Sequence, residues 1–252
     1  MMLSILWRFL IVAAVFVPLE RLFALHAGQK ILREGWKTDL VYAFINSAII
    51  QIGAALVITL LSECLMRVMP SEVPLAVASQ PAWVQFIEVV IIADIGFYIG
   101  HRTAHAVPFL WRFHQVHHSS ERLDWLAAAR VHPVDQIFMS SASMVPILVL
   151  GFSNGALLAY LTVYFWHSYF LHSNVRVGFG FLRPVIASPE FHHWHHADES
   201  DAYDKNYAGQ LSVLDRLFGT LYIPADKKPE KYGTGAHLDT NYLSQLIYPF
   251  KN

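Results

Sequence analysis

Four apolar stretches separated by polar segments dominate the first two thirds of the chain. They cover residues 3–19, 40–61, 83–100 and 137–165. The second stretch is free of charged residues and reaches about 33 Å as an α-helix, which is long enough to cross a bilayer. Residues 3–19 also fit a secretory signal peptide, but no clear small-x-small cleavage site follows them. The pattern therefore predicts about four membrane-spanning segments.

The fourth stretch contains helix breakers, namely Pro146, Gly151 and the pair Asn154-Gly155. Such breakers predict a broken hairpin of two helices that returns the chain to the side it left. From about residue 176 the chain is polar and rich in Gly, Pro, Asp and Tyr. We therefore expect an all-α integral membrane protein whose histidine clusters lie in a helical cap on the cytoplasmic side.

Composition supports the membrane assignment. Hydrophobic residues make up 55% of the chain and charged residues 15%, with a mean hydropathy of +0.38. These values are typical of a protein that faces lipid. The formal net charge is -1, so no basic field indicates nucleic acid as a partner. We predict a single membrane domain over residues 1–252, with a transmembrane anchor region at 1–100, a catalytic region at 101–224 that includes a hairpin at 137–172, and a tail at 225–252.

The placement of basic residues predicts the orientation. The segment between the first two spans holds Arg21, Lys30, Arg33 and Lys37, whereas the next one holds only Arg67 before the third span. By the positive-inside rule the first segment is cytoplasmic. Two further crossings and the hairpin then bring both histidine clusters to the cytoplasmic side of a multi-pass membrane protein.

The histidines are unevenly distributed. All but two of the 14, His26 and His237, lie between positions 101 and 196, and we expect those two at the surface. Three groups have the i, i+3 or i, i+4 spacing that places imidazoles on one helix face. They are His101 and His105; His114, His117 and His118; and His192, His195 and His196. His193 lies on another side of its turn, where a structural role is expected. With Cys64 as the single cysteine, a metal must be held by nitrogen and oxygen.

The number of imidazoles bears on the number of ions. A closed zinc site uses about four ligands, so the three groups together suit two ions. Imidazole binds zinc, copper, iron and nickel alike, and the chain does not carry the two Glu-x-x-His motifs of carboxylate-bridged di-iron bundles. Two ions in a nitrogen shell at a membrane surface indicate oxygen activation on a lipid. The alternatives are a membrane zinc hydrolase, and a non-enzymatic metal-binding or transport protein.

Polar residues near the clusters are candidates for orienting the ligands. Asp94 precedes His101 by two helical turns, so it either accepts a proton from a ligand imidazole or pairs with Arg102 or Arg112 as a structural acid. Asp198, Asp204 and Asn206 near the last cluster are similar candidates. Asp215 and Arg216 fit a structural turn that docks the cap.

Several motifs resemble one known family. They are HRTAH, WRFHQVHHSS, ARVHPVD, LHSN, SPEFHHWHHA and NYAGQLSVLDRLFGTLYIP, in this order between residues 94 and 224. In this respect the chain is similar to the fatty acid hydroxylase and sterol desaturase superfamily of membrane-bound, histidine-rich di-iron oxygenases. The resemblance implies a mainly helical membrane fold, two iron ions, O2 as co-substrate, a lipid substrate, and oxidation of a C–H bond by hydroxylation or desaturation. Zinc is the expected substitute in a purified sample.

The resemblance also implies a ligand set. By position it comprises the eight histidines of the three groups together with His172. The family's better known fatty-acid hydroxylases have a further histidine at the position of Ser168; here His167 or His132 fills the gap, or one metal has fewer ligands. The chain carries no GxGxxG, haem or iron–sulfur motif, so an external electron donor of the reductase, cytochrome or ferredoxin type is expected.

Overall fold

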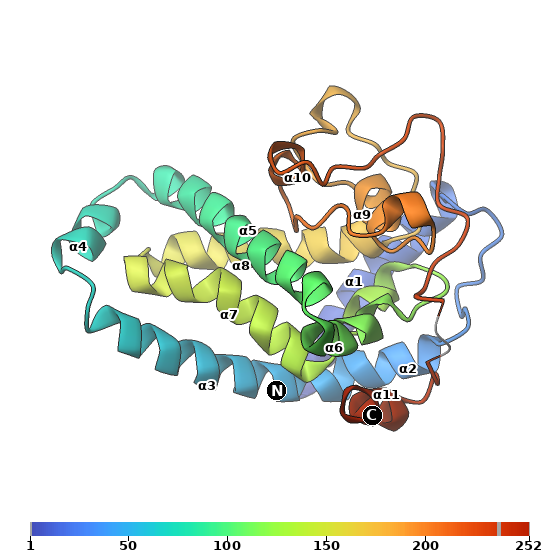
Figure 1. Cartoon of the computed structure of the whole chain (residues 1–252), viewed down its shortest axis with the longest axis horizontal. Helices are drawn as coiled ribbons and strands as arrows, with labels where there is room; N and C mark the ends of the chain where they lie inside the picture. Colours follow the sequence, from blue (N-terminus) through green and yellow to red (C-terminus); the bar gives the residue numbers. More distant parts are fainter. Residues whose placement is uncertain (1, 236–237, 252) are drawn as a thin grey trace.

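The chain folds into helices connected by turns and long loops (Figure 1). The structure is a computed structural model and describes residues 2–235 and 238–251. Over these residues it contains two isolated β-bridges and no strand, so the predicted all-α class is confirmed. The helices are α1 Met2–Leu22, α2 Trp36–Val41, α3 Ser47–Met66, α4 Glu72–Ala78, α5 Ala82–Ala106, α6 Pro108–His118, α7 Pro133–Leu150, α8 Asn154–His172, α9 Pro189–His195, α10 Val213–Leu217 and α11 Tyr242–Ile247.

Three helices of the described chain are long and apolar enough to cross a membrane. They are Trp36–Met66, in which a π-helical turn at Tyr42–Asn46 joins α2 to α3, then Ala82–Ala106, and Pro133–Leu150. They contain the second and third predicted spans and the first part of the fourth. The first predicted span lies in α1, which is not one of the three. The chain is a membrane protein by this measure.

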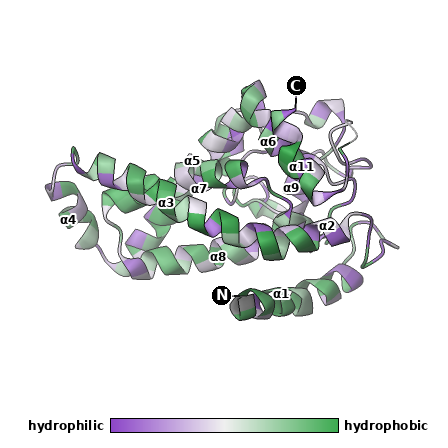
Figure 2. Ribbon diagram, turned by 90° about the horizontal axis from the view of Figure 1, so that it is seen from below, coloured by the Kyte–Doolittle hydropathy of each residue, from purple (hydrophilic) through white to green (hydrophobic). Residues whose placement is uncertain are grey.

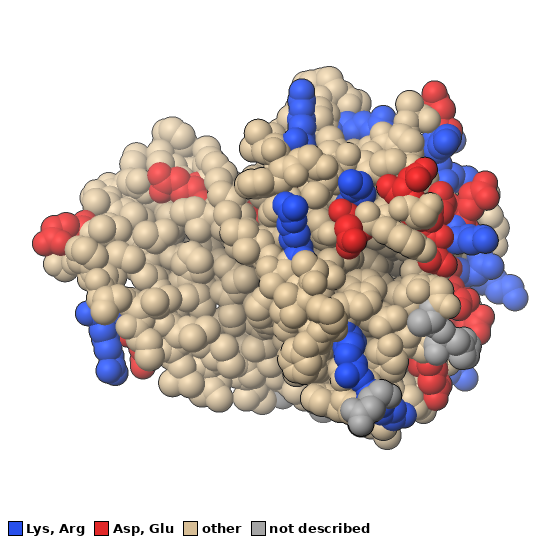
Figure 3. All heavy atoms as spheres, viewed as in Figure 1, with Lys and Arg blue, Asp and Glu red and all other residues tan. Residues whose placement is uncertain are grey.

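The long helices expose apolar side chains where a water-soluble protein would bury them. On the helix Trp36–Met66 an exposed row runs through Ile45, Ile49, Ile52, Leu56 and Leu60, at helical spacing. Figure 2 shows hydrophobic residues along most of α1, α3, α7 and α8. In Figure 3 the region of the long helices is nearly free of charge, apart from the end around α4. This distribution is expected of helices in contact with lipid.

The predicted hairpin consists of α7 and α8, and both helices pack against α5. Gly151 ends α7 with a φ of 78°, a left-handed conformation that favours glycine. A side chain at this position would also collide with Pro74 of α4. The turn of the hairpin therefore lies beside the α3–α5 connection, at the opposite end from the histidines (Figure 1).

Two local signals position the histidine-bearing helices. Val107 has an extended backbone and Pro108 begins α6, so the chain turns sharply at the end of α5. At α9, the side chain of Ser188 accepts the Phe191 N–H and Pro189 occupies the first turn. The cap around α9 consists more of loops than of helices, because its short helices are separated by long connections. The prediction of a helical cap was in this respect too simple.

The contact between α5 and α7 generates a stability prediction. A Cβ at Gly96 of α5 would collide with the backbone carbonyl of Ala142 in α7, whereas a Cβ at Gly155 of α8 meets nothing within 4 Å. Gly96→Ala should therefore cost about 1–3 kcal/mol of stability through overpacking. Gly155→Ala should be neutral or slightly stabilising. Thermal unfolding of the detergent-solubilised variants measures both; equal unfolding temperatures would contradict this helix contact.

Candidate metal centre

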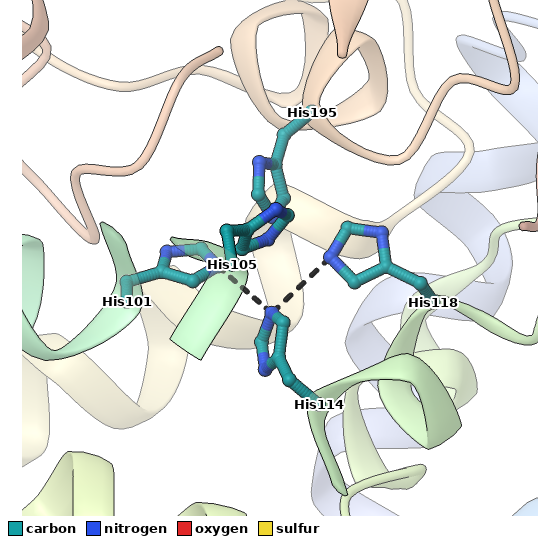
Figure 4. Close-up of side chains that lie close together, drawn as sticks. All are labelled: His101, His105, His114, His118 and His195. Atoms are coloured by element: carbon teal, nitrogen blue, oxygen red, sulfur yellow. Dashed lines mark hydrogen bonds between the residues drawn. The ribbon is translucent and has the colours of Figure 1, made fainter. Parts of the chain in front are cut away.

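Nine histidines converge in two adjoining groups. In each group the nearest nitrogens all lie within 4.8 Å of one another. The first group consists of His101, His105, His114, His118 and His195 (Figure 4), and the second of His117, His172, His192 and His196. The rings of His118 and His196, one from each group, stack with centroids 4.4 Å apart. The nine residues are those proposed from spacing and resemblance; their role as ligands stays a prediction.

Helical spacing distributes the histidines between the groups. On α6, His114 and His118 point to the first group, while His117 points to the second. At α9, His195 joins the first group, whereas His192 and His196 join the second. The i, i+3, i+4 trios of the sequence are therefore divided, and each helix contributes to both groups.

Most rings of the first group are held through Nδ1 by an oxygen. His101 Nδ1 donates to the Tyr207 carbonyl at 2.7 Å, and His195 Nδ1 donates to the Lys205 carbonyl at 2.8 Å. Carboxylates hold two more rings: Asp135 lies 3.0 Å from His114 Nδ1, and Asp204 lies 3.4 Å from His105 Nδ1. Such bonds fix the tautomer and leave Nε2 as an acceptor.

In the second group, two rings are likewise held through Nδ1 by a backbone carbonyl. His117 Nδ1 donates to the Arg130 carbonyl at 3.0 Å, and His172 Nδ1 donates to the Ser168 carbonyl at 2.9 Å. Arg130 is itself buried in a network with Asp39, at 2.5 Å from its Nε. Asp39 also binds Arg33, which binds Asp124. This network joins the segment before α2 to the backbone that holds His117.

The Nε2 atoms, which lie on the side of each ring away from the Nδ1 hydrogen bond, face one another without protons between them. Nε2 of His101 lies 3.0 Å from Nε2 of His114, and Nε2 of His117 lies 3.2 Å from Nε2 of His172. Since all four rings donate through Nδ1, each pair places two lone pairs in opposition. Nε2 of His105 and Nε2 of His195 are buried without any hydrogen-bond partner. A cation bound between these nitrogens would accept the opposed lone pairs and give the unpaired Nε2 atoms a partner. The donor set therefore fits bound metal.

Burial keeps the imidazoles neutral. It lowers the pKa of His114, His118 and His195 well below the usual 6.5, and the neighbouring imidazoles lower it further. The rings are therefore unprotonated at neutral pH, which is the form that binds metal.

The loop at residues 204–211 carries three of the orienting oxygens. Asp204 and Asn206 have φ values of 56° and 61°, uncommon for residues other than glycine. The Asn206 side chain donates to the carbonyls of Phe191 and Tyr222. Strained backbone of this kind persists only where the surroundings fix it.

Two buried acids also fix this loop. Asp215 accepts the N–H groups of Tyr207 and Ala208, which agrees with its expected role in docking the cap. Asp94 accepts the N–H groups of Gly209, Gln210 and Leu211 at 2.6–2.9 Å. A carboxylate on α5 thus anchors the loop whose carbonyl holds His101.

Three residues that the sequence suggested as orienting groups form hydrogen bonds with partners other than an imidazole. Asp94 bonds neither an imidazole nor Arg102 or Arg112, because three backbone donors occupy it, and Asn206 likewise holds backbone. Asp198 accepts the Tyr203 hydroxyl at 2.6 Å. Asp204 does face His105, as proposed. The sequence reasoning missed Asp135, although it lies in ARVHPVD, because nothing in the spacing linked it to His114.

The other histidines that the structure describes lie outside both groups. His132 caps α7 by accepting the Val134 N–H and donates to the Leu246 carbonyl, while His167 donates to the Ala187 carbonyl. His193 is structural, as expected, and contacts the Tyr232 hydroxyl. His26 contacts the same hydroxyl and is half-buried, so its expected surface position was wrong. His237 lies outside the described residues.

Two cavities approach the histidines from different elements. One, of about 60 Å³, lies between α5, α7 and α8 and touches His101 and His114 of the first group and three rings of the second. Phe97, Met139 and Leu171 contribute its apolar wall, and Tyr164 and Gln136 are polar neighbours. The other, of about 330 Å³, is lined by His105, His118, His195, Trp111 and loop residues of the cap.

Comparison with known proteins agrees with this geometry. The family model described as fatty acid hydroxylase matches residues 86–220, more than half of the chain. The chain belongs to the fatty acid hydroxylase family. The matched range includes all nine histidines of the two groups and Asp135. It begins in α5 and ends just after α10, which is close to the catalytic region predicted from the motifs.

Curated members of the family act on lipids. The chain is 29% identical over 84% of its length to the ornithine lipid hydroxylase of Rhizobium tropici, and covers 65% of that protein. It is 34% identical to the alkylglycerol monooxygenases of Danio rerio and Homo sapiens, over 58% and 53% of its length, and covers 31% and 30% of theirs. The chain thus spans less than two thirds of these relatives. All are oxidoreductases by name. No solved structure matches it significantly.

The Asp135–His114 pair generates a metal-affinity prediction. Asp135→Asn removes the charge that raises the basicity of His114 and should weaken metal binding by about 10–100-fold. Asp198→Asn changes a carboxylate that contacts no imidazole and should bind metal like the unaltered protein. Metal retained after dialysis against graded chelator concentrations, measured by mass spectrometry, tests both. Equal retention in the two variants would remove Asp135 from the centre.

Proposed function

We propose that this protein catalyses the O2-dependent oxidation, by hydroxylation or desaturation, of a C–H bond in a lipid at a centre of two iron ions. The observation that carries the proposal is the pair of adjoining imidazole groups, with Nε2 lone pairs opposed at 3.0 Å and 3.2 Å. Membership of a family whose curated relatives are lipid hydroxylases and monooxygenases supports the same reaction class.

Two ions follow from the number and division of the donors. Nine imidazoles exceed the needs of one ion, and the groups are separate enough for each to hold its own. His101, His105, His114, His118 and His195 would hold one ion, and the second group the other. Neither group contains a carboxylate among the described residues, so a hydrolytic zinc site with a carboxylate ligand is the weaker interpretation.

The protein groups around the centre have distinct tasks. Two iron ions and O2 supply the oxidising chemistry when bound, since no side-chain acid or base activates an aliphatic C–H bond. Asp135, Asp204 and the backbone carbonyls hold the imidazoles in one tautomer and orientation. Eight of the nine rings are buried, which limits the access of water to the reacting region.

The substrate side of the centre is the cavity between α5, α7 and α8. It touches both histidine groups, and its apolar wall of Phe97, Met139 and Leu171 suits an acyl or alkyl chain. The three helices that line this cavity also carry exposed apolar side chains, so the cavity lies beside the surface assigned to lipid. We assign a lipid substrate to the protein on this basis.

The membrane arrangement belongs to the same proposal. We propose about four transmembrane segments, the last of them the α7–α8 hairpin, with both histidine groups on the cytoplasmic side. The turn of the hairpin beside Pro74 supports this arrangement, since both connections then lie on the opposite side. Electrons come from an external donor of the reductase, cytochrome or ferredoxin type, which reaches the centre from the cytoplasm.

Metal content and O2 consumption of the purified protein test the reaction. With an added reductant and a lipid extract, we expect two irons per chain and O2 uptake that depends on lipid. Mass spectrometry of lipids from cells with and without the protein identifies the substrate. Zinc with O2-independent product release, or metal flux without turnover, would overturn the proposal.

One histidine from each group tests the division into two sites. His117→Ala and His195→Ala should each abolish turnover and lower metal occupancy, because each removes a donor from a different group. Both variants should still insert in the membrane. His167→Gln, which preserves a donor for the Ala187 carbonyl, should keep metal and activity. Wild-type activity in either alanine variant would contradict the assignment.

A further inference from the structure

An apolar surface on the cap lies beside the long helices. Two connected segments form it: α10 with the residue after it, and the loop before α9. We call it the apolar shoulder and define it as Phe181, Leu182, Val185, Leu217 and Phe218. All five side chains are exposed; Phe181, Leu217 and Phe218 are 88%, 72% and 58% accessible. The Val213 N–H donates to the Val185 carbonyl and the Ser212 hydroxyl donates to the Arg183 carbonyl, so the two segments lie side by side.

The shoulder is continuous with the lipid-facing side of α5. Phe218 stacks on Tyr98 of α5 with ring centroids 5.2 Å apart. Ile95, which lies one helical turn before Tyr98 on the same side of α5, is itself exposed. Figure 1 shows α10 above the second half of α5. The apolar side of α5 therefore meets the shoulder where Phe218 packs on Tyr98.

The depth of this contact matches the membrane interface. Arg102 lies one helical turn beyond Tyr98 on α5 and donates to its hydroxyl at 3.4 Å. As an exposed cation, Arg102 marks the level at which α5 enters the headgroups. The backbone of Tyr98, on whose ring Phe218 stacks, thus lies about 6 Å along the axis of α5 on the lipid side of Arg102.

Charge around the shoulder fits a lipid surface. Arg102 and Arg216 are exposed beside the apolar side chains, whereas Arg183 is paired with Glu190. Figure 3 shows this part of the cap as tan with blue side chains. Apolar and aromatic residues bordered by arginine are typical of segments that lie in the interface of an anionic membrane.

We propose that the apolar shoulder inserts into the cytoplasmic interface of the bilayer, so that the cap rests on lipid at a second place beside the spanning helices. The proposal rests on the membrane placement given above and is independent of the reaction. Because α10 contains Asp215, which holds the backbone of Tyr207 and Ala208, the inserted surface is joined directly to the loop that orients His101.

Spin labelling of the full-length protein in nanodiscs tests the shoulder. Cys64 is the single cysteine and is exposed, so Cys64→Ser provides a background without reactive thiols. A nitroxide at Leu217→Cys should collide far more with O2, which partitions into lipid, than with a water-soluble nickel chelate. The preference should increase when phosphatidylglycerol replaces part of the phosphatidylcholine, because the arginines favour anionic lipid.

Spin labels at two further positions distinguish a failure of the shoulder proposal from a failure of the membrane placement. Ile52→Cys on α3 is the lipid reference, and Asp201→Cys, exposed on the cap, is the water reference. A label at 217 that behaves like the one at 201, while 52 reports lipid, would overturn the shoulder and leave the membrane placement intact. A label at 217 shielded from both reagents would indicate a protein contact and overturn it as well. A water-exposed label at 52 would overturn the placement itself.

Discussion

The structure depends on holding neutral imidazoles with their lone pairs directed at one another. Without a cation this arrangement is unfavourable, because opposed lone pairs repel and buried nitrogens such as Nε2 of His105 and His195 stay unpaired. The surrounding fold therefore has to fix the rings from behind, and it does so for six of the nine. It does so at Nδ1, through carbonyls for His101, His117, His172 and His195 and through carboxylates for His105 and His114.

Many of the buried polar residues orient the imidazoles indirectly, by fixing the backbone that holds them. Asp94, Asn206 and Asp215 bond to no imidazole, yet together they fix the backbone of the loop at 204–211. The buried network of Arg33, Asp39 and Arg130 likewise fixes the carbonyl that holds His117. Buried charged groups are costly unless they are fully paired, so their concentration around one centre is consistent with a functional constraint.

The membrane helices position the histidines and line a cavity beside them. The α3–α5 connection and the turn of the α7–α8 hairpin lie together at one end of the molecule, and the histidines lie at the other. The same helices form the cavity that reaches both groups, with Phe97 and Met139 in its wall. Two of the helices that are long enough to span a membrane, α5 and α7, therefore also line this cavity, and the proposed shoulder lies beside α5 on the cap.

The sequence by itself determined the helical class, the apolar spans at 40–61 and 83–100, the break at Gly151 and the nine histidines that converge. These features are local: hydropathy, helical spacing and glycine conformation act within a few residues. Only the tertiary structure decided that His117 and His118 belong to different groups, that Asp135 holds His114, and that Asp94 anchors a loop more than one hundred residues away. Such pairings depend on how helices and loops that are distant in the sequence pack together. The local spacing of residues does not reveal which of these elements meet.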